Sequence, residues 1–186
     1  MLFAFVALVC LISVPIAGGR LGLLGDLQFR GIWPAVAGLA LQVLIITIAP
    51  EGADWTHTAA HLSSYVLVGW VVWANRHIPW LWLVGVGGLL NFICIAANGG
   101  VMPASEWARE AAGMAPAGPE FTNSGVLADP VLAFLGDVFP LPVPWSPNVF
   151  SIGDLVMSAG AFVLLHTAAG SRLARRPRRG VPAPSR

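Results

Sequence analysis

Two aspartates, Asp137 and Asp154, lie within one segment that is otherwise apolar or rich in proline, FLGDVFPLPVPWSPNVFSIGD. Two carboxyl groups held side by side cannot both ionise easily, so they share a proton. One can then act as a general base on water while the other acts as a general acid. The alternative is structural: Asp154 caps the start of a helix, where the dipole favours an anion, and Asp137 is a turn residue after Gly136. The spacing of the two aspartates alone favours this structural alternative over a catalytic pair.

A second polar stretch, ANGGVMP, follows an apolar segment and contains Asn98, Gly99 and Gly100. Glycine adopts positive φ at low cost, so this stretch is typical of the end of a helix. Its backbone N–H groups and the Asn98 amide could also bind a substrate backbone or carboxylate next to Asp154. Both interpretations can hold together, and the helix end is favoured.

A third cluster, DWTHTAAH, contains Asp54, His57 and His61. The histidines are one helical turn apart, so they share a face, and Asp54 stands one turn before His57. Such a face can ligate a metal, but two histidines without a clear third ligand favour polar residues at an interface. We therefore predict no metal site and no cofactor.

The elements that must position these residues are hydrophobic helices. Of the 186 residues, 56% are hydrophobic and 10% are charged, and the mean hydropathy is +0.75. Soluble domains carry about 25% charged residues. Apolar segments of this density are typical of transmembrane helices, and no nucleic-acid motif is present. The predicted fold is an all-α, multi-pass membrane protein with five transmembrane helices, at residues 2–17, 32–48, 59–73, 78–97 and 150–169.

The arginines predict the orientation, because cytoplasmic loops carry the excess of basic residues. Only Arg109 falls on the outer side of this topology. The N-terminus is then outside and the C-terminus inside the bacterial cell membrane. The inner arginines are Arg20, Arg30, Arg76, Arg172, Arg175, Arg176, Arg178, Arg179 and Arg186.

The predicted organisation is one transmembrane domain, residues 1–170, followed by a basic, disordered cytoplasmic tail, residues 171–186. Anionic lipid headgroups attract such a tail. The first segment could be a signal peptide, but no basic residue precedes its apolar run, so a retained helix is favoured. The lipid bilayer is the predicted partner, and nucleic acid is not.

The outer loop, residues 98–149, is rich in proline and does not suggest a second conventional domain. Within it, ASEWAREAAGM predicts a short amphipathic helix with Ser105 as its N-cap. PVLAFLGDVFPLP is apolar enough to lie at the membrane surface or to fold over the bundle. PLPVPWSP is expected to be stiff and to hold the chain extended between Asp137 and the last helix.

The stretch FSIGDLVMSAGAFVLL resembles the last helix of lipoprotein signal peptidase (signal peptidase II), an aspartyl membrane protease. Phe150, Ile152, Asp154 and Gly160 fall in register with its motif, and LGDVFP resembles the setting of its other catalytic aspartate. The resemblance implies a dyad of Asp137 and Asp154. GGLLNFI is similar to a Gly-Gly-x-x-Gly-Asn stretch of that family, which implies that Asn91 is a counterpart.

The motif differs in two places: Ser151 stands where that family has asparagine, and Gly153 where it has alanine. An Asn-x-Gly-Ala-Ala-Phe stretch of the family is also absent. Ser151 is therefore predicted only as a support for the dyad, together with Asn98.

Nearly the whole chain resembles an uncharacterised family of bacterial, mostly actinobacterial, membrane proteins. The stretches that carry this resemblance are GGRLGLLGDLQFRG, IAANGGVMPAS, FLGDVFPLP and NVFSIGDLVMSAG. This family supplies no established activity. We expect a non-catalytic scaffold or a lipid- or ligand-binding bundle with an outward-facing Asp/Asn/Gly site. The alternative is an aspartyl intramembrane peptidase, so whether the chain is an enzyme stays open.

Overall fold

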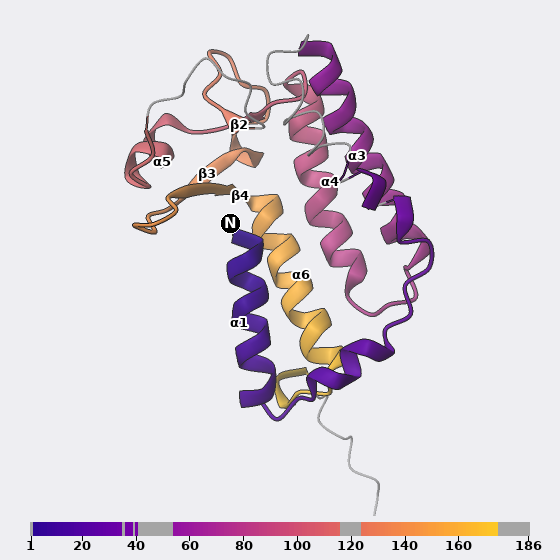
Figure 1. Ribbon diagram of the computed structural model, residues 1–186. Helices are drawn as coiled ribbons and strands as arrows, with labels where there is room; N and C mark the ends of the chain where they lie inside the picture. Colours follow the sequence, from indigo (N-terminus) through magenta and orange to yellow (C-terminus); the bar gives the residue numbers. More distant parts are fainter. Residues whose placement is uncertain (1, 35, 39, 41–53, 116–123, 175–186) are drawn as a thin grey trace, which may run out of the picture.

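The computed structural model describes residues 2–34, 36–38, 40, 54–115 and 124–174. Four long helices dominate this part of the chain, and the third of them runs opposite to the other three (Figure 1). They are α1 (Leu2–Ile16), α3 (Asp54–Ala74), α4 (Leu81–Ala97) and α6 (Ile152–Ala168). These match four of the five predicted segments to within a few residues. The remaining predicted segment, 32–48, lies mostly outside the described residues, although 33–34, 36–38 and 40 are helical.

Among the described residues, no helix combines the length and the apolar character required of a membrane span.

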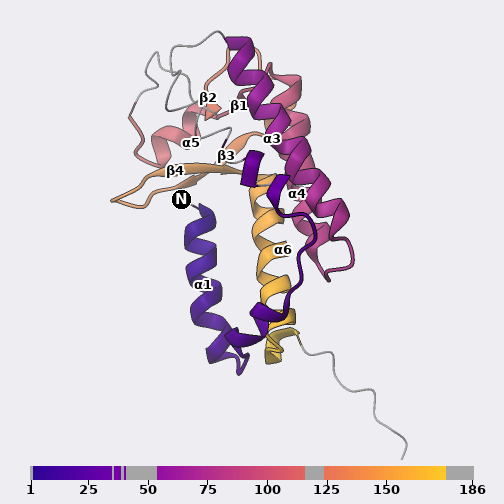
Figure 2. The same ribbon diagram turned by 45° about the vertical axis from the view of Figure 1, so that its right-hand side comes forward.

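The helices pack side by side in the order α1, α6, α4, α3, as two views show (Figures 1 and 2). Glycines allow α4 and α6 to approach closely. A Cβ added to Gly160 would lie 2.7 Å from the backbone nitrogen of Val84, and one added to Gly87 would collide with the backbone of Gly153. Gly87 belongs to the stretch GVGGLL and Gly160 to SAGA, and small residues of this kind let helix backbones come close together.

The chain between α4 and α6 folds into a small cap over one end of the bundle. It contains β1 (Met102–Pro103), α5 (Glu106–Ala111), β2 (Ser124–Gly125), η2 (Ala133–Leu135), β3 (Asp137–Leu141) and β4 (Asn148–Ser151). β1 and β2 are parallel, and β3 and β4 form an antiparallel hairpin. The backbone N–H of Ala108 donates to Ser105 Oγ, which confirms Ser105 as the N-cap of α5.

The prediction of a mostly helical chain is confirmed, but the prediction of helices alone is wrong, because the described part of the cap contains two small sheets. Residues 142–147 also do not hold the chain extended; they turn it back on itself. β-Branched and aromatic residues favour strand pairing, and Phe139 stacks on Phe150 across the hairpin with ring centroids 5.4 Å apart. Cross-strand packing outweighs the tendency of the prolines toward an open loop.

The opposite end of the bundle joins α1 to α6. The 3₁₀ helices η1 (Leu21–Asp26) and η3 (Arg172–Ala174) lie here. Arg20 N donates to Ala169 O at 2.8 Å, and Arg172 N donates to Ala17 O at 3.0 Å. Residues 171–174, assigned from sequence to a disordered tail, are therefore ordered, because these backbone bonds tie them to α1. Residues 175–186 lie outside the described residues.

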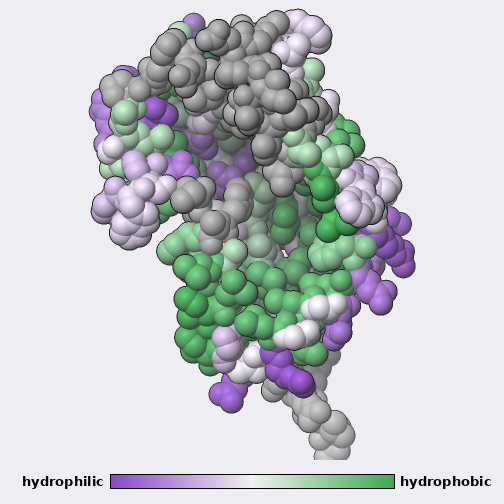
Figure 3. All heavy atoms as spheres, in the orientation of Figure 1, coloured by the Kyte–Doolittle hydropathy of each residue, from purple (hydrophilic) through white to green (hydrophobic). Residues whose placement is uncertain are grey.

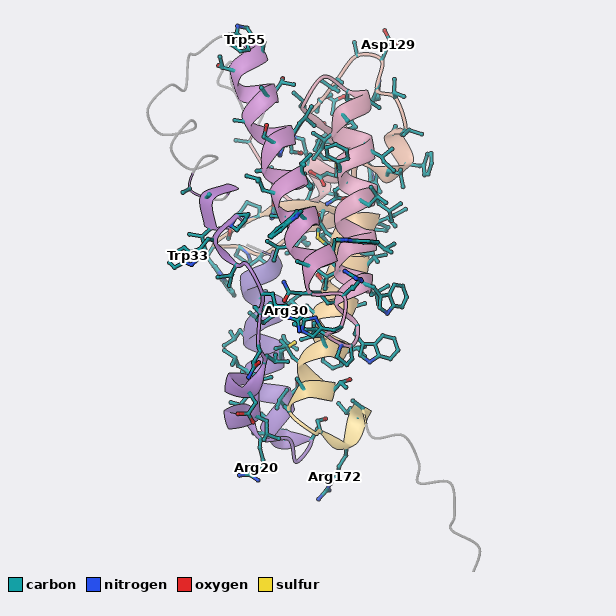
Figure 4. All side chains as sticks on the ribbon, turned by 90° about the vertical axis from the view of Figure 1, so that its right-hand side faces the viewer. Arg20, Arg30, Trp33, Trp55, Asp129 and Arg172 are labelled. Carbon is teal, nitrogen blue, oxygen red and sulfur yellow. The ribbon has the colours of Figure 1, made fainter. Side chains whose placement is uncertain are left out.

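Arg20 and Arg172 lie at the same end of the molecule, and Asp129 and Trp55 lie at the other (Figure 4). The cap and the N-terminal end of α1 are on the side of Asp129 (Figures 1 and 4). Two arginines thus lie at the end of the molecule opposite the acidic Asp129.

Candidate functional site

The hairpin brings Asp137 back to the start of α6. In its register, Asp137 is the partner of Ser151, and Leu141 is the partner of Asn148. Ser151 is also the N-cap residue of α6, and Asp154 stands three residues later, in the first turn. Both aspartates therefore lie at the N-terminal end of α6: Asp137 on the hairpin strand that pairs with Ser151, and Asp154 in the first turn of the helix.

Asp154 closes a capping box. Its backbone N–H donates to Ser151 Oγ at 3.0 Å, and the Ser151 N–H donates to Asp154 Oδ2 at 3.1 Å. The structural alternative for Asp154 is thus confirmed. The other carboxylate oxygen, Oδ1, accepts a hydrogen bond from Asn91 Nδ2 on α4 at 2.8 Å. Asp154 therefore caps its own helix and also lies at the contact between α4 and α6.

Asn91 links the two helices through both ends of its amide. Its Oδ1 accepts a hydrogen bond from Ser151 Oγ at 2.8 Å while its Nδ2 donates to Asp154. Asn91 and Ser151 are both buried. A Cβ added to Gly153 would collide with Asn91 Oδ1, so this position has room for glycine alone. The glycine that departs from the signal peptidase motif is thus the residue that admits the Asn91 side chain.

Asp137 is only 7% exposed. Burial raises its pKa to about 7, because a buried carboxylate loses hydration. The hydrogen bond from Ser124 Oγ to Asp137 Oδ2, at 2.5 Å, lowers the pKa, and the charge of Asp154 raises it. Asp137 therefore changes its charge near neutral pH and is electrostatically coupled to Asp154.

Both aspartates line one cavity of about 520 Å³ between α3, α4, α6 and the cap. Its polar lining residues are His61, Ser64, Tyr65, Asn91, Ser124, Asp137 and Asp154. Its remaining lining residues are Val66, Val68, Gly69, Val72, Val84, Gly85, Gly88, Leu89, Phe92, Ile95, Met102 and Met157.

The lining changes character along the helices. On α3 the polar lining residues lie within 61–65 and the apolar ones, with Gly69, within 66–72. On α4 the polar residue is Asn91, and the lining residues nearer the start of that helix, within 84–89, are apolar residues and glycines. Val72 stands eleven positions after His61, and at a rise of about 1.5 Å per residue this stretch of α3 is about 16 Å long. The cavity is therefore polar beneath the cap and apolar toward the middle of the bundle.

Asn98, Gly99 and Gly100 are not among the cavity-lining residues. Asn98 instead holds the end of α4 to the cap through two hydrogen bonds. Its Nδ2 donates to Val131 O at 2.7 Å, and its Oδ1 accepts from Val131 N at 2.8 Å. Gly99 and Gly100 have φ of 67° and 95°, so the helix end is confirmed. Thr58 Oγ1 donates to Gly99 O. The substrate-positioning role of the three residues stays a prediction.

The side chains of Asp54 and His57 lie outside the described residues. His61 is buried, and its Nδ1 lies 2.8 Å from Gly100 O. Among the side chains that the structure describes, no three histidines, cysteines, aspartates or glutamates come together to hold a metal ion.

Sequence reasoning missed Tyr65 and Ser124 as site residues. Tyr65 lies beside Asn91, within electrostatic range of both Asp137 and Asp154. It is the one tyrosine of the chain and stands next to Ser64 in an apolar segment, which is the signal that could have found it. Ser124 stands in a polar loop stretch, where no pattern distinguishes it.

Comparison with known proteins agrees with the resemblance to an uncharacterised family. An uncharacterized protein of Thermotoga maritima is 26% identical over 137 residues, which cover 73% of this chain and 74% of that protein. No solved structure matches the chain. The model of DUF5317, described as a family of unknown function, matches residues 26–166, which include Asn91, Asp137 and Asp154. The chain therefore belongs to the DUF5317 family.

Proposed function

We propose that this protein is a multi-pass protein of the bacterial cell membrane whose cavity binds an amphiphilic molecule without converting it. The change from a polar to an apolar lining along the cavity is the observation that carries this proposal. Pockets of a few hundred cubic ångströms with few polar groups suit small ligands. The polar group of the ligand would lie beneath the cap, near Asp137, Asp154 and Asn91, and its apolar chain would lie between α3 and α4.

The surface of the helices supports a membrane location. Figure 3 shows hydrophobic residues over the helices and hydrophilic ones near the ends. Monomeric soluble proteins rarely expose apolar patches of this extent. The exposed apolar side chains on the long helices include Leu8, Leu11, Ile12 and Ile16 of α1, Val66, Val68, Trp70 and Trp73 of α3, Trp82, Val86, Leu89 and Ile93 of α4, and Leu155 of α6.

The separation of charges supports the orientation. The end of the bundle that holds Arg20 and Arg172 would face the cytoplasm, where the arginine-rich tail would meet anionic lipid headgroups. The cap, with Asp129, would face outward. The predicted five-helix topology with an outer N-terminus stays part of this proposal.

Filling the cavity tests the binding function. Gly88 lines the cavity, and a Cβ there would meet Met157 Sδ at 3.8 Å, an ordinary contact distance, so Gly88→Leu adds bulk at the cavity wall. Ala96→Leu is the matched control, since Ala96 lies on the same helix and is exposed. We expect Gly88→Leu to weaken the binding of monooleoylglycerol to the protein in nanodiscs at least about tenfold. Ala96→Leu should leave it unchanged. Equal affinities for wild type and Gly88→Leu would disprove the cavity as the binding site.

A second function, aspartyl peptidase chemistry, is favoured by one observation: Asp137 has a raised pKa and shares the cavity with Asp154. Asp154 accepts hydrogen bonds from Asn91 and Ser151, an arrangement that suits a general base. It would take a proton from a water molecule that attacks the peptide carbonyl. Asp137 would give its proton to the leaving amine.

A further inference from the structure

The polar end of the cavity holds two acidic groups, and the described part of its lining gives neither an arginine or lysine partner. Among the described residues that line it, none is arginine or lysine. Arg109, on α5 in the cap, donates to Ala115 O at 3.0 Å and is not a lining residue. His61 lies in the lining, but its Nδ1 is engaged with Gly100 O. A phosphate or carboxylate group entering this end would meet two carboxyl groups and no cation to balance it.

The same end offers acceptors for a donor-rich headgroup. Asp137 is 7% exposed and lines the cavity, and within the described part of the chain no group donates to its Oδ1. Each carboxylate oxygen can accept two hydrogen bonds, so Asp154 keeps free capacity beyond the bonds from Asn91 and Ser151. An ammonium group presents three donors and one positive charge, and its hydrogen bonds to carboxylates are among the strong ones.

We propose that the cavity selects amphiphiles whose polar group is a primary amine, with the ammonium held between Asp137 and Asp154, and that it discriminates against phosphate and carboxylate headgroups. This proposal rests on the proposed binding function and narrows its ligand class. The amine can belong to a lipid or to the end of an acylated peptide, and both present the same ammonium.

Acidity should modulate this selection. Because burial raises the pKa of Asp137 to about 7, this carboxyl is ionised at pH 8 and protonated at pH 5.5. The ionised form attracts an ammonium more strongly. Among the residues that the structure describes, the other titratable groups around Asp137 are Asp154 on α6, Tyr65 and His61 on α3, and Cys94 on α4.

Competition binding to the full chain in nanodiscs of uncharged lipid tests the proposal. At pH 8, dodecylammonium should displace labelled monooleoylglycerol at a concentration at least about tenfold lower than dodecyl phosphate. Butylamine, which lacks the long chain, should bind far more weakly, because it leaves the apolar half of the cavity empty. Asp137→Asn should remove most of the preference, and so should a change to pH 5.5.

Two outcomes separate the headgroup proposal from the binding function. If Gly88→Leu weakens dodecylammonium binding while dodecyl phosphate competes equally well in the wild type, the amine selection is wrong and the binding function stands. If Gly88→Leu changes the binding of neither dodecylammonium nor dodecyl phosphate, the amine selection and the binding function are both wrong. An acylated peptide with a free amino terminus and its N-acetylated form then identify the source of the amine. If the amine belongs to an acylated peptide, the peptide with the free amino terminus should compete better than its N-acetylated form. Equal competition by the two forms would exclude a peptide as the source of the amine.

Discussion

Gly87→Ala is expected to lower the free energy of unfolding by about 2–3 kcal/mol, whereas Gly88→Ala, at the next residue, should leave it unchanged or raise it by up to about 1 kcal/mol. A Cβ at Gly87 would collide with Gly153 O and lie 2.6 Å from Met157 N, both backbone atoms that cannot move unless α6 shifts. A Cβ at Gly88 would meet Met157 Sδ at an ordinary contact distance, and alanine favours helix over glycine.

The measurement is reversible unfolding of both variants in mild detergent, followed by circular dichroism. Because the two glycines share a helix and a neighbouring residue, their difference isolates the close approach of α4 to α6. Equal stabilities would contradict this packing. Asn91 stands one turn after Gly87, so a shift of α6 should also break the hydrogen bond from Asn91 to Asp154. Monooleoylglycerol binding should therefore fall for Gly87→Ala and stay unchanged for Gly88→Ala.

If the dyad is catalytic, Asp137→Asn and Asp154→Asn should each slow hydrolysis of a lipid-modified peptide at least about a hundredfold. Each substitution keeps the shape of the side chain but removes its ability to carry the proton that the reaction moves. Asp129→Asn is the matched control, because Asp129 lies on the same side of the molecule and is exposed. This variant should hydrolyse the peptide at the wild-type rate.

The pH profile of the same reaction gives an independent check. The acid role requires Asp137 to be protonated, so the rate should decline as pH rises through about 7, the raised pKa of this carboxyl. A quenched fluorescent peptide in detergent micelles provides the readout. Wild-type rates in both aspartate variants would eliminate the dyad and leave the non-converting binding function in place.

The helices could be predicted from the sequence because long apolar segments specify them without reference to partners. The start of α6 was placed two residues early, at Phe150, because hydrophobicity alone cannot distinguish a strand residue from a helix residue. In the structure Phe150 pairs with Phe139, and Ser151 caps the helix. The two aspartates were recognised from their chemistry, which is unusual in an apolar segment.

The rest of the site depends on contacts between distant parts of the chain. The hairpin register that sets Asp137 opposite Ser151 could not be predicted, because prolines in the intervening stretch are more typical of an open loop. Asn91 was found through a resemblance alone, since an amide in an apolar helix gives no sign of which helix it faces. Tyr65 could have been noticed as the one tyrosine of the chain, but nothing in the sequence shows which helix it faces. The cavity arises from three helices and the cap, so no single segment encodes it.

Photolabelling tests the binding cavity most directly. Monooleoylglycerol with a diazirine near the end of its acyl chain should be incorporated into the wild-type protein in nanodiscs, and mass spectrometry should locate the adducts. The apolar half of the cavity predicts adducts on Val72 and Val84, which Gly88→Leu should remove. Adducts confined to the exposed side chains Leu11 and Ile12 of α1, and unchanged in Gly88→Leu, would contradict the account.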